Sequence, residues 1–456
     1  MRGHLDEPTG SEETAHGSAE RDLVDVVGLD EPARSGEAAP LARRQVLKYG
    51  VGGLACASAG GAALYYLKQR FASITTAAVF KNDAPDDALW RLWAAKGWIQ
   101  EARHYRKLGQ NVQCLLCPNG CVLEPGDRSH CRDRVNRNGT LYTLAYANPC
   151  AMHVDPIEKK PLFHFLPGVA AFSVATAGCG FRCLNCQNWD ISQSKPEETK
   201  DPQGPLRRPR PDELNGLSAA ELKRATLMPS DVVAAAEAFH CRTIAYTYSE
   251  PIVWYEYMLD TARLARAKGI KNLWITCGFI QPDPLAQLCQ YIDAANVNLK
   301  SFNDDVYRRL NSGRLQPILD TLLALKRAGV WFEVTNLIVP SYTDKPEMIR
   351  AMCRWLLDHI GPDYPLHFSR FFPKHKLDHL SPTPVKILLE AREIARDVGL
   401  RYVYIGNVPE LDDGETTCCP HCNRTLVARQ FFSSSCVGLR NGACAACGTR
   451  IPGVWA

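Results

Sequence analysis

Three cysteines, Cys179, Cys183 and Cys186, lie at CxxxCxxC spacing just after the apolar segment 171–176. Soft thiolates at this spacing can hold three irons of a four-iron, four-sulfur (4Fe-4S) cluster. The fourth iron is then left without a protein ligand, so that a substrate can bind it. The spacing therefore predicts a catalytic iron–sulfur site. A partial zinc site and three buried cysteines are the simpler alternatives.

The segments around these cysteines alternate between strand and helix patterns, which is typical of βα units around a parallel sheet. The expected strands are 171–176, 243–248, 272–276, 295–300, 331–339, 365–371 and 401–405. The expected helices are 230–240, with Ser230 as N-cap, then 255–267, 283–292, 316–328, 345–359 and 383–398. Six or seven strands are too few for a full barrel. We therefore expect an α/β fold, a partial (β/α) barrel with its site at the carboxyl ends of the strands, where the three cysteines lie.

Several sequence runs resemble the radical S-adenosylmethionine (SAM) enzymes of the AmmeMemoRadiSam system, which are related to pyruvate formate-lyase activating enzymes. The matching runs are 155–168, 186–193, 246–251, 299–300, 367–371 and 402–407. The resemblance covers the chain from about Gln113 to Trp455. It implies a radical SAM fold in which Cys179, Cys183 and Cys186 ligate a 4Fe-4S cluster that takes an electron from an external one-electron reductant. SAM is then cleaved to methionine and a 5′-deoxyadenosyl radical, which abstracts hydrogen from an unknown substrate.

The same resemblance suggests residues for binding SAM. Glu250, at the end of the second strand, matches a carboxylate that hydrogen-bonds the SAM ammonium, a charge-assisted and therefore strong contact. Later strand ends carry further residues that the resemblance places near SAM or substrate: Asn298, Lys300, Asn336, His367 and Asn407. The alternative for each of these is a strand-end side chain that satisfies the backbone of a loop.

The sequence departs from the family pattern at three positions. Asn298 stands where relatives commonly have Asp, and Cys277 where they commonly have Asn. Asn185 precedes the last cluster cysteine, a place where an aromatic side chain often packs on adenine. These departures put a carboxylate-dependent contact and adenine stacking in question but leave the cysteine triplet intact.

Two further groups of four cysteines flank the expected barrel. Cys114, Cys117, Cys121 and Cys131 can close a tetrahedral site for structural zinc or hold an auxiliary iron–sulfur centre, and spacing alone does not choose between the two. Two CxxC pairs near the C-terminus have the arrangement of a zinc ribbon: Cys419, Cys422, Cys444 and Cys447. Cys418 and His421 are alternative ligands there.

Composition bounds these interpretations. The chain has 456 residues, 46% of them apolar, enough for one large core and attached modules. A net charge of +4 with dispersed basic residues argues against a nucleic-acid partner. Most of the 19 cysteines fall in the three groups, which indicates reduced metal ligands rather than a disulfide framework. We expect four regions: 1–70, a Cys-rich module over 71–168, the barrel over 169–412 and a zinc-ribbon-like module over 413–456.

The first 70 residues begin with a polar tail typical of disorder. Residues 42–48 then resemble a twin-arginine export signal, followed by an uncharged stretch over 49–67. If uncleaved, this stretch is just long enough to anchor the chain in a membrane. An amphiphilic helix in a cytoplasmic protein is the alternative, so the sequence leaves the location open. Residues 193–227 are rich in Pro and charge and predict a long surface loop with a helix around 219–225.

The sequence thus predicts a radical SAM enzyme. A glycyl-radical-enzyme activating protein is the nearest enzymatic alternative. A metal-binding scaffold or electron carrier without SAM chemistry is an alternative of another class. The family resemblance also implies association with Ammecr1-like and Memo-like proteins, and it names no substrate.

Overall fold

The largest sheet of the protein joins eight strands. The computed structural model describes residues 78–199, 226–430 and 432–455. In this part of the chain the sheet has the order β14-β13-β12-β11-β10-β9-β8-β7, and its two end strands do not pair with each other. Its strands are β7 (Ala151–Pro156), β8 (Ala170–Ala175), β9 (Thr243–Tyr246), β10 (Lys271–Thr276), β11 (Ala294–Asn298), β12 (Trp331–Ile338), β13 (Leu366–Arg370) and β14 (Val403–Gly406). All neighbours pair in parallel except β7, which pairs antiparallel with β8.

The α/β class expected from the sequence is confirmed, and all seven expected strands are present, with ends shifted by at most two residues. Strand β7 is an addition. It lies at the edge of the sheet and ends at Pro156. Proline has no backbone N–H to donate to a neighbouring strand, so the sequence of β7 has only a weak strand pattern. Because β7 pairs with β8, the main sheet begins ahead of residue 169, the boundary expected from the sequence.

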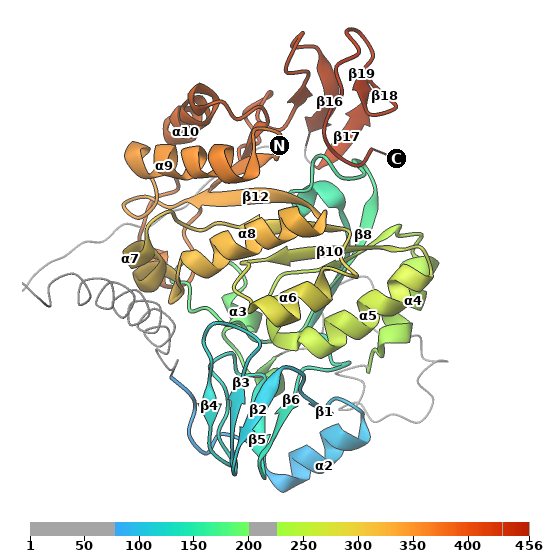
Figure 1. Ribbon diagram of the computed structural model, residues 1–456, viewed down its shortest axis with the longest axis vertical. Coiled ribbons are helices and arrows are strands. Elements are labelled where there is room, and N and C mark those ends of the chain that lie inside the picture. Colours follow the sequence, from blue (N-terminus) through green and yellow to red (C-terminus); the bar gives the residue numbers. More distant parts are fainter. Residues whose placement is uncertain (1–77, 200–225, 431, 456) are drawn as a thin grey trace, which may run out of the picture. The chain divides into compact units, whose positions relative to one another are not determined.

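Helices connect the parallel strands and cover the sheet (Figure 1). They are α4 (Pro229–Ala238), α5 (Tyr255–Ala267), α6 (Pro282–Leu288), α7 (Asp304–Val306), α8 (Gln316–Ala328), α9 (Pro346–Trp355) and α10 (Val385–Val398). Shorter helical segments are α3 (Trp189–Ser192), η1 (Ile157–Lys159), η2 (Pro196–Glu198), η3 (Pro251–Trp254), η4 (Tyr307–Asn311), η5 (Leu356–Ile360) and η6 (His375–Leu377). Helices α5 and α8 have the bounds expected from the sequence.

The expected N-cap at Ser230 is wrong, because α4 begins one residue earlier. Pro229 takes the first helical position, where its fixed φ angle suits the helix and its missing N–H costs nothing. The carboxylate of Asp231 accepts a hydrogen bond of 2.8 Å from the backbone N–H of Met228. A proline and an acidic residue thus define this helix start in place of a serine.

The helices bury apolar faces against the sheet. Helix α4 contacts β8 and β9, α5 contacts β10, α8 contacts β12, and α10 contacts β13 and β14. The buried side of α8 carries Ile318, Leu319, Leu322 and Leu325. Each such side chain contributes about 1.5–3 kcal/mol when it leaves water, so this packing holds the sheet in the shape that the site requires.

The N-terminal part of the described chain forms two small three-stranded sheets, with the orders β1-β6-β5 and β2-β3-β4. Its elements are α2 (Asp87–Ala95), β1 (Gln100–Glu101), β2 (Tyr105–Leu108), β3 (Asn111–Cys114), β4 (Val122–Leu123), β5 (Arg134–Arg137) and β6 (Thr140–Thr143). A buried ion pair joins this part to α5: Arg134 Nη2 lies 2.7 Å from Glu256 Oε2, and both side chains are at most 2% exposed. Residues 78–156 are therefore fixed to the main sheet.

The C-terminal part forms a three-stranded sheet, β15-β16-β17, and the pair β18-β19. These strands are β15 (Thr417–Cys418), β16 (Thr425–Gln430), β17 (Ser433–Cys436), β18 (Leu439–Arg440) and β19 (Ala443–Cys444). Leu426 and Val427 share one buried cluster with Tyr402 and Tyr404 of the main domain. The guanidinium of Arg429 donates a hydrogen bond of 2.6 Å to the backbone oxygen of Phe163.

Some sequence expectations fall outside the described residues. These are the export-like segment 42–48, the uncharged stretch 49–67, and the helix expected around 219–225. None of the helices in the described part of the chain combines the length and the apolar character that crossing a membrane requires.

Candidate functional site

A cavity of about 540 Å³ lies at the carboxyl ends of the parallel strands, where βα loops converge. Among the residues that line it are most of those that the sequence places around the cluster, SAM or substrate: Cys179, Cys183, Cys186, Glu250, Asn298, Lys300 and His367. Asn407 lines it as well. Asn336 does not: its side-chain amide donates to the backbone oxygen of Leu299 at 2.7 Å, which is the alternative role given above.

The strands direct polar side chains into this cavity because successive residues of a strand point to opposite faces. The polar residues that line it are spaced two apart in β11, at Asn296 and Asn298, and in β13, at His367 and Ser369, and β12 adds Thr335. The residues between them, such as Val297 and Phe368, are fully buried on the other face. One period-two pattern therefore supplies both the polar wall of the cavity and the apolar contact with the helices.

The cysteine triplet lies in the loop after β8, and each sulfur has at least one hydrogen-bonding neighbour. The backbone N–H of Phe181 donates to Cys179 Sγ at 3.3 Å. The amide of Asn311 donates to Cys183 Sγ at 3.2 Å. These donors favour thiolates. Burial raises the pKa of Cys179 well above its ordinary value. A metal must therefore displace the thiol proton when it binds.

The loop that carries the triplet depends on a glycine. Gly178 has a φ angle of +88°, and a Cβ atom added to it would lie 2.2 Å from the carboxylate of Asp133. Only glycine, which has no Cβ atom, can adopt this positive φ angle and also lie so close to a neighbouring side chain. Gly178 thus sets the path of the chain into Cys179 and brings the loop against the N-terminal part of the protein.

Glu250 also lines the cavity, near Cys179, and already accepts four hydrogen bonds. Oε1 accepts from the hydroxyl of Thr276 at 2.7 Å and from the N–H of Ile252 at 3.3 Å. Oε2 accepts from the N–H of Cys277 at 2.8 Å and from its thiol at 2.7 Å. Burial raises the pKa of Glu250, and these donors oppose the shift. Thr276 and Cys277 are therefore site residues that the sequence did not suggest as partners of Glu250.

Lys300 supplies a positive charge beside the triplet. Burial opposes its charged form, but the sulfurs of Cys183, Cys277 and Cys186 raise its pKa above the ordinary value. Its backbone N–H donates a hydrogen bond of 2.8 Å to the hydroxyl oxygen of Tyr307. The ammonium group is thus held near the cysteines by the loop after β11. The amide of Asn298 donates to the backbone oxygen of Thr276 at 3.2 Å, so this residue also supports a neighbouring strand end.

Comparison with known proteins assigns the domain that carries this site. Residues 173–356 match the Radical SAM superfamily. A protein of Methanocaldococcus jannaschii, itself uncharacterized, is 42% identical over 356 residues, which cover 77% of this chain and 99% of the archaeal protein. The chain belongs to the radical SAM superfamily. It shares its family with the archaeal protein, and membership implies a 4Fe-4S cluster, SAM, and the cleavage of SAM with one electron.

Two more distant similarities accompany this assignment. The pyruvate formate-lyase-activating enzyme of Clostridium pasteurianum is 23% identical over 192 residues, 41% of this radical SAM protein and 68% of that enzyme. Among solved structures, a radical SAM methyltransferase from Sphaerobacter thermophilus is 12% identical, with a TM-score of 0.39 over 76% of this chain and 88% of the methyltransferase. At that TM-score the likeness assigns neither a reaction nor a residue to this radical SAM protein.

Behind His367, which lines the cavity, lies a buried charge that sequence reasoning missed. Glu333 is fully buried in β12 and accepts hydrogen bonds from the backbone N–H groups of Phe163 and His164 at 3.0 and 2.7 Å. A ring nitrogen of His367 lies 2.7 Å from its Oε2. Burial alone would raise the pKa of Glu333, but these partners hold it below the ordinary value. A charged residue inside the run Trp331–Val334 was the only sequence signal, because buried strands rarely contain one.

A second missed group lies on the wall formed by β7 and η1. Asp155 accepts hydrogen bonds from Lys159 at 2.9 Å, from Lys160 at 2.6 Å, and from the hydroxyl of Tyr248. Burial lowers the pKa of Lys160 to about 8, although Asp155 opposes the shift. Lys159, Lys160 and Tyr248 all line the cavity. The run 155–168, noted above for its resemblance, thus forms part of this wall.

Asn185 also lines the cavity, at the place where relatives often have an aromatic residue. It is 8% exposed, and its side-chain oxygen has no hydrogen-bond partner among the described residues. An unpaired acceptor that is this deeply buried is costly unless a ligand supplies the donor.

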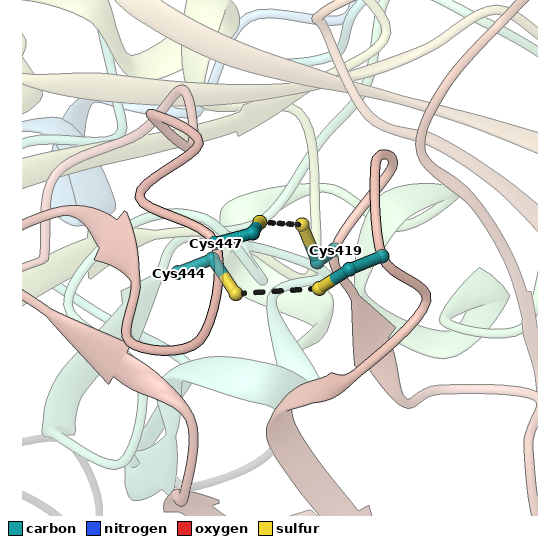
Figure 2. A group of neighbouring side chains, drawn as sticks. Cys419, Cys444 and Cys447 are labelled. Atoms are coloured by element: carbon teal, nitrogen blue, oxygen red, sulfur yellow. Dashed lines mark hydrogen bonds between the residues drawn. The ribbon is translucent and has the colours of Figure 1, made fainter.

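The two other cysteine groups lie outside the cavity. At the C-terminus, Cys419 Sγ lies 3.5 Å from Cys447 Sγ, and Cys422 Sγ lies 3.6 Å from Cys444 Sγ (Figure 2). All four sulfurs are within 4.8 Å of one another, which fits one tetrahedral ion. The predicted C-terminal group is therefore assembled by the fold. The N-terminal group is assembled as well, since Cys114, Cys121 and Cys131 all raise the pKa of Cys117 after the larger effect of burial.

Proposed function

We propose that this protein is a radical SAM enzyme that cleaves SAM to methionine and a 5′-deoxyadenosyl radical, which takes hydrogen from a polar substrate in the same cavity. One observation carries the proposal. The three cysteines, the acidic Glu250 and the basic Lys300 line a single cavity at the carboxyl edge of the sheet. The three thiolates are soft ligands for iron. The negative and the positive side chain can pair with the ammonium and the carboxylate of an amino acid group.

The residues around the triplet fit a cluster of several irons. The sulfurs of Cys179, Cys183 and Cys186 are spread more widely than those of the C-terminal group, since among the described residues only the C-terminal group has its sulfurs within 4.8 Å of one another. Hydrogen bonds to the sulfurs and the nearby Lys300 offset negative charge. When bound, such a cluster with one open iron chelates SAM and supplies the electron that breaks the S–C5′ bond.

The chain's own residues can orient SAM. Glu250 pairs with the ammonium group once the thiol of Cys277, a weak donor, turns away from Oε2. Lys300 pairs with the carboxylate. The unpaired oxygen of Asn185 accepts a hydrogen bond from the amino group of adenine, a polar contact in place of the aromatic stacking of relatives.

The part of the cavity that SAM leaves free then receives the substrate. Lys160, Tyr248 and His367 also line the cavity and are held by Asp155 and Glu333 behind them. Buried side chains fixed in this way are organised before a substrate arrives, which reduces the cost of ordering them on binding. We expect a polar substrate that offers both donors and acceptors.

The test is an anaerobic assay of the full chain. After reconstitution with iron and sulfide, the protein is mixed with SAM and dithionite, and 5′-deoxyadenosine is measured by mass spectrometry. We expect product from the wild type and from Cys289→Ala, a matched cysteine variant outside all three groups, and none from Cys183→Ala. A wild type that holds a reducible cluster and yields no product would overturn the proposal and favour a scaffold or electron carrier.

A glycyl-radical activating enzyme is the second candidate, favoured by the similarity to the Clostridium activating enzyme. Its substrate would be a glycine of a partner protein. Ammecr1-like and Memo-like proteins are the partners to try first, because the matching sequence runs resemble the AmmeMemoRadiSam system. Electron paramagnetic resonance (EPR) of mixtures with SAM and reductant distinguishes the candidates. A stable carbon-centred radical on the partner supports activation, and its absence together with turnover of a small molecule contradicts it.

For the C-terminal group we propose a single structural zinc ion. Besides the close sulfurs, the hydroxyl of Thr449 lies 3.2 Å from Cys447 Sγ, a contact that can stabilise the thiolate that zinc requires. Metal analysis should find about one zinc per chain that is lost in Cys422→Ala. Equal zinc in the variant would contradict the assignment.

A further inference from the structure

The N-terminal cysteines differ from the C-terminal ones in how far apart their sulfurs lie. Among the described residues, Cys419, Cys422, Cys444 and Cys447 are the only group of three or more candidate ligands whose atoms all lie within 4.8 Å of one another. Neither Cys114, Cys117, Cys121 and Cys131 nor the radical SAM triplet meets that limit. A zinc ion with Zn–S bonds of about 2.3 Å requires sulfurs about 3.8 Å apart. Ligands to different irons of one cluster must lie further apart.

The four N-terminal thiols nevertheless lie near one another. Cys114, Cys121 and Cys131 are buried, and Cys117 is partly exposed. Each sulfur receives a backbone N–H, donated in turn by Leu116, Asn119, His130 and Asp133. The hydroxyl of Ser129 lies 3.0 Å from Cys131 Sγ. Such donors stabilise thiolates, which iron and zinc both require.

Arginines surround this group and offset negative charge. Arg134 lies near Cys114 and Cys131, and the carboxyl group of Asp133 also lies near Cys131. Arg182 is close to Cys121 and Cys131, and also to Cys179 of the triplet. A buried site bordered by several guanidinium groups suits an anionic group with four thiolates.

The group also lies directly beside the loop of the radical SAM triplet. The side-chain amide of Asn119, two residues after Cys117, donates to the backbone oxygen of Gly180 at 2.8 Å. Arg182 donates to the backbone oxygen of Cys179 at 3.0 Å and also to that of His130, the neighbour of Cys131. One hydrogen bond therefore links the two cysteine loops, and one arginine bridges them.

We propose that Cys114, Cys117, Cys121 and Cys131 hold a redox-active 4Fe-4S cluster, not a zinc ion, beside the SAM-binding cluster. Four thiolates saturate its four irons, so this cluster binds no SAM. It accepts one electron from a low-potential protein donor and passes one electron on. No bond is formed or broken in this step.

The experiment removes the other cluster. A full-length variant with Cys179, Cys183 and Cys186 changed to Ala is purified anaerobically, and its iron, sulfide and zinc are measured together with EPR after reduction. We expect about four irons and four sulfides per chain, one zinc, and the EPR signal of a reduced 4Fe-4S cluster. About two zinc ions and no iron would overturn the proposal.

The wild type keeps the proposal testable if that variant fails to fold. It should contain about eight irons and one zinc, and Cys117→Ser should lose about four irons while Cys289→Ala loses none. About four irons in the wild type would overturn the proposal. This result is independent of the proposed function. A protein that holds both clusters and makes no 5′-deoxyadenosine would overturn the proposed SAM cleavage but not the second cluster.

Discussion

The thiol of Cys277 lies 2.7 Å from Oε2 of Glu250 and is the fourth donor to that buried carboxylate. A carboxylate has about four acceptor positions, so Glu250 is saturated before SAM arrives. Cys277, one of the residues that depart from the family pattern, thus occupies an acceptor position of Glu250 that the ammonium group takes in the proposed SAM complex. A thiol is a weak donor, which makes Cys277 the contact that is given up most easily.

Removing the acceptor should therefore weaken SAM binding, and removing the thiol should not. We expect Glu250→Gln to raise the Kd for SAM about tenfold or more, because a charge-assisted hydrogen bond contributes roughly 1.5–3 kcal/mol. Cys277→Ala keeps the backbone N–H and should bind SAM as tightly as the wild type or more tightly. Anaerobic calorimetry on reconstituted protein measures both. Wild-type affinity in Glu250→Gln would show that SAM is anchored elsewhere.

The raised pKa of Glu250 predicts how this binding depends on pH. Only the ionised carboxylate pairs with an ammonium group, and the acid is neutral below its pKa. SAM affinity should therefore rise with pH through a pKa above that of an ordinary glutamate. Glu250→Gln should remove this dependence. A pH profile of Kd that is the same in both proteins would contradict the assignment.

Stability should also fall in mild acid because of His164. This imidazole is fully buried, lies 2.6 Å from the hydroxyl of Tyr404 and 2.7 Å from the oxygen of Pro452, and has its pKa lowered to about 4 by burial. The unfolded chain binds a proton near pH 6.5, while the folded one resists it. The stabilisation present above pH 6.5 is then lost as pH falls toward 4, by up to about 3 kcal/mol.

Melting temperatures of the full chain at pH 7 and pH 5 test this effect. In His164→Gln the difference between the two should be smaller than in the wild type, because the titrating group is gone. Glu333, whose pKa is lowered, loses its stabilising charge only in stronger acid, below the ordinary range of a glutamate. His130, whose pKa burial also lowers to about 4, contributes in the same interval, so the change in His164→Gln isolates the share of His164, and an unchanged difference in the variant would contradict its role.

The sequence predicts the parts of this site that depend on local patterns. Alternating strand and helix segments locate the parallel sheet, and the spacing of Cys179, Cys183 and Cys186 locates the cluster loop. The structure then adds Asp155 with Tyr248 and Glu333 with His367, which meet only because distant segments become neighbours. No local pattern encodes such pairs. The edge strand β7 was missed for a related reason, since a short strand ending in proline has a weak periodic signal.

A buried ion pair should control how firmly the N-terminal part is attached. Arg134 and Glu256 are 1% and 2% exposed, and the carboxylate also accepts the N–H of Arg103 at 2.6 Å. Arg134→Met leaves Glu256 buried without its partner, which we expect to cost about 3–5 kcal/mol. Arg137 and Asp87 form a matched exposed pair, at 31% and 74% exposure. Arg137→Met should cost less than about 1 kcal/mol. Thermal unfolding measures both, and equal effects would contradict the buried-pair argument.

If the N-terminal cysteines hold a second cluster, the source of the electron should matter. Cys117 is the partly exposed member of its group, so a protein donor can approach there, whereas the triplet lies within a cavity. Dithionite is small enough to reach either site. In Cys117→Ser we expect 5′-deoxyadenosine formation with reduced flavodoxin to fall at least about tenfold, while the rate with dithionite stays within about threefold of the wild type. Cys289→Ala should behave as the wild type with both reductants. An equal loss with both reductants would mean that Cys117 only supports the fold, and no loss with either would mean that the electron enters directly at the triplet.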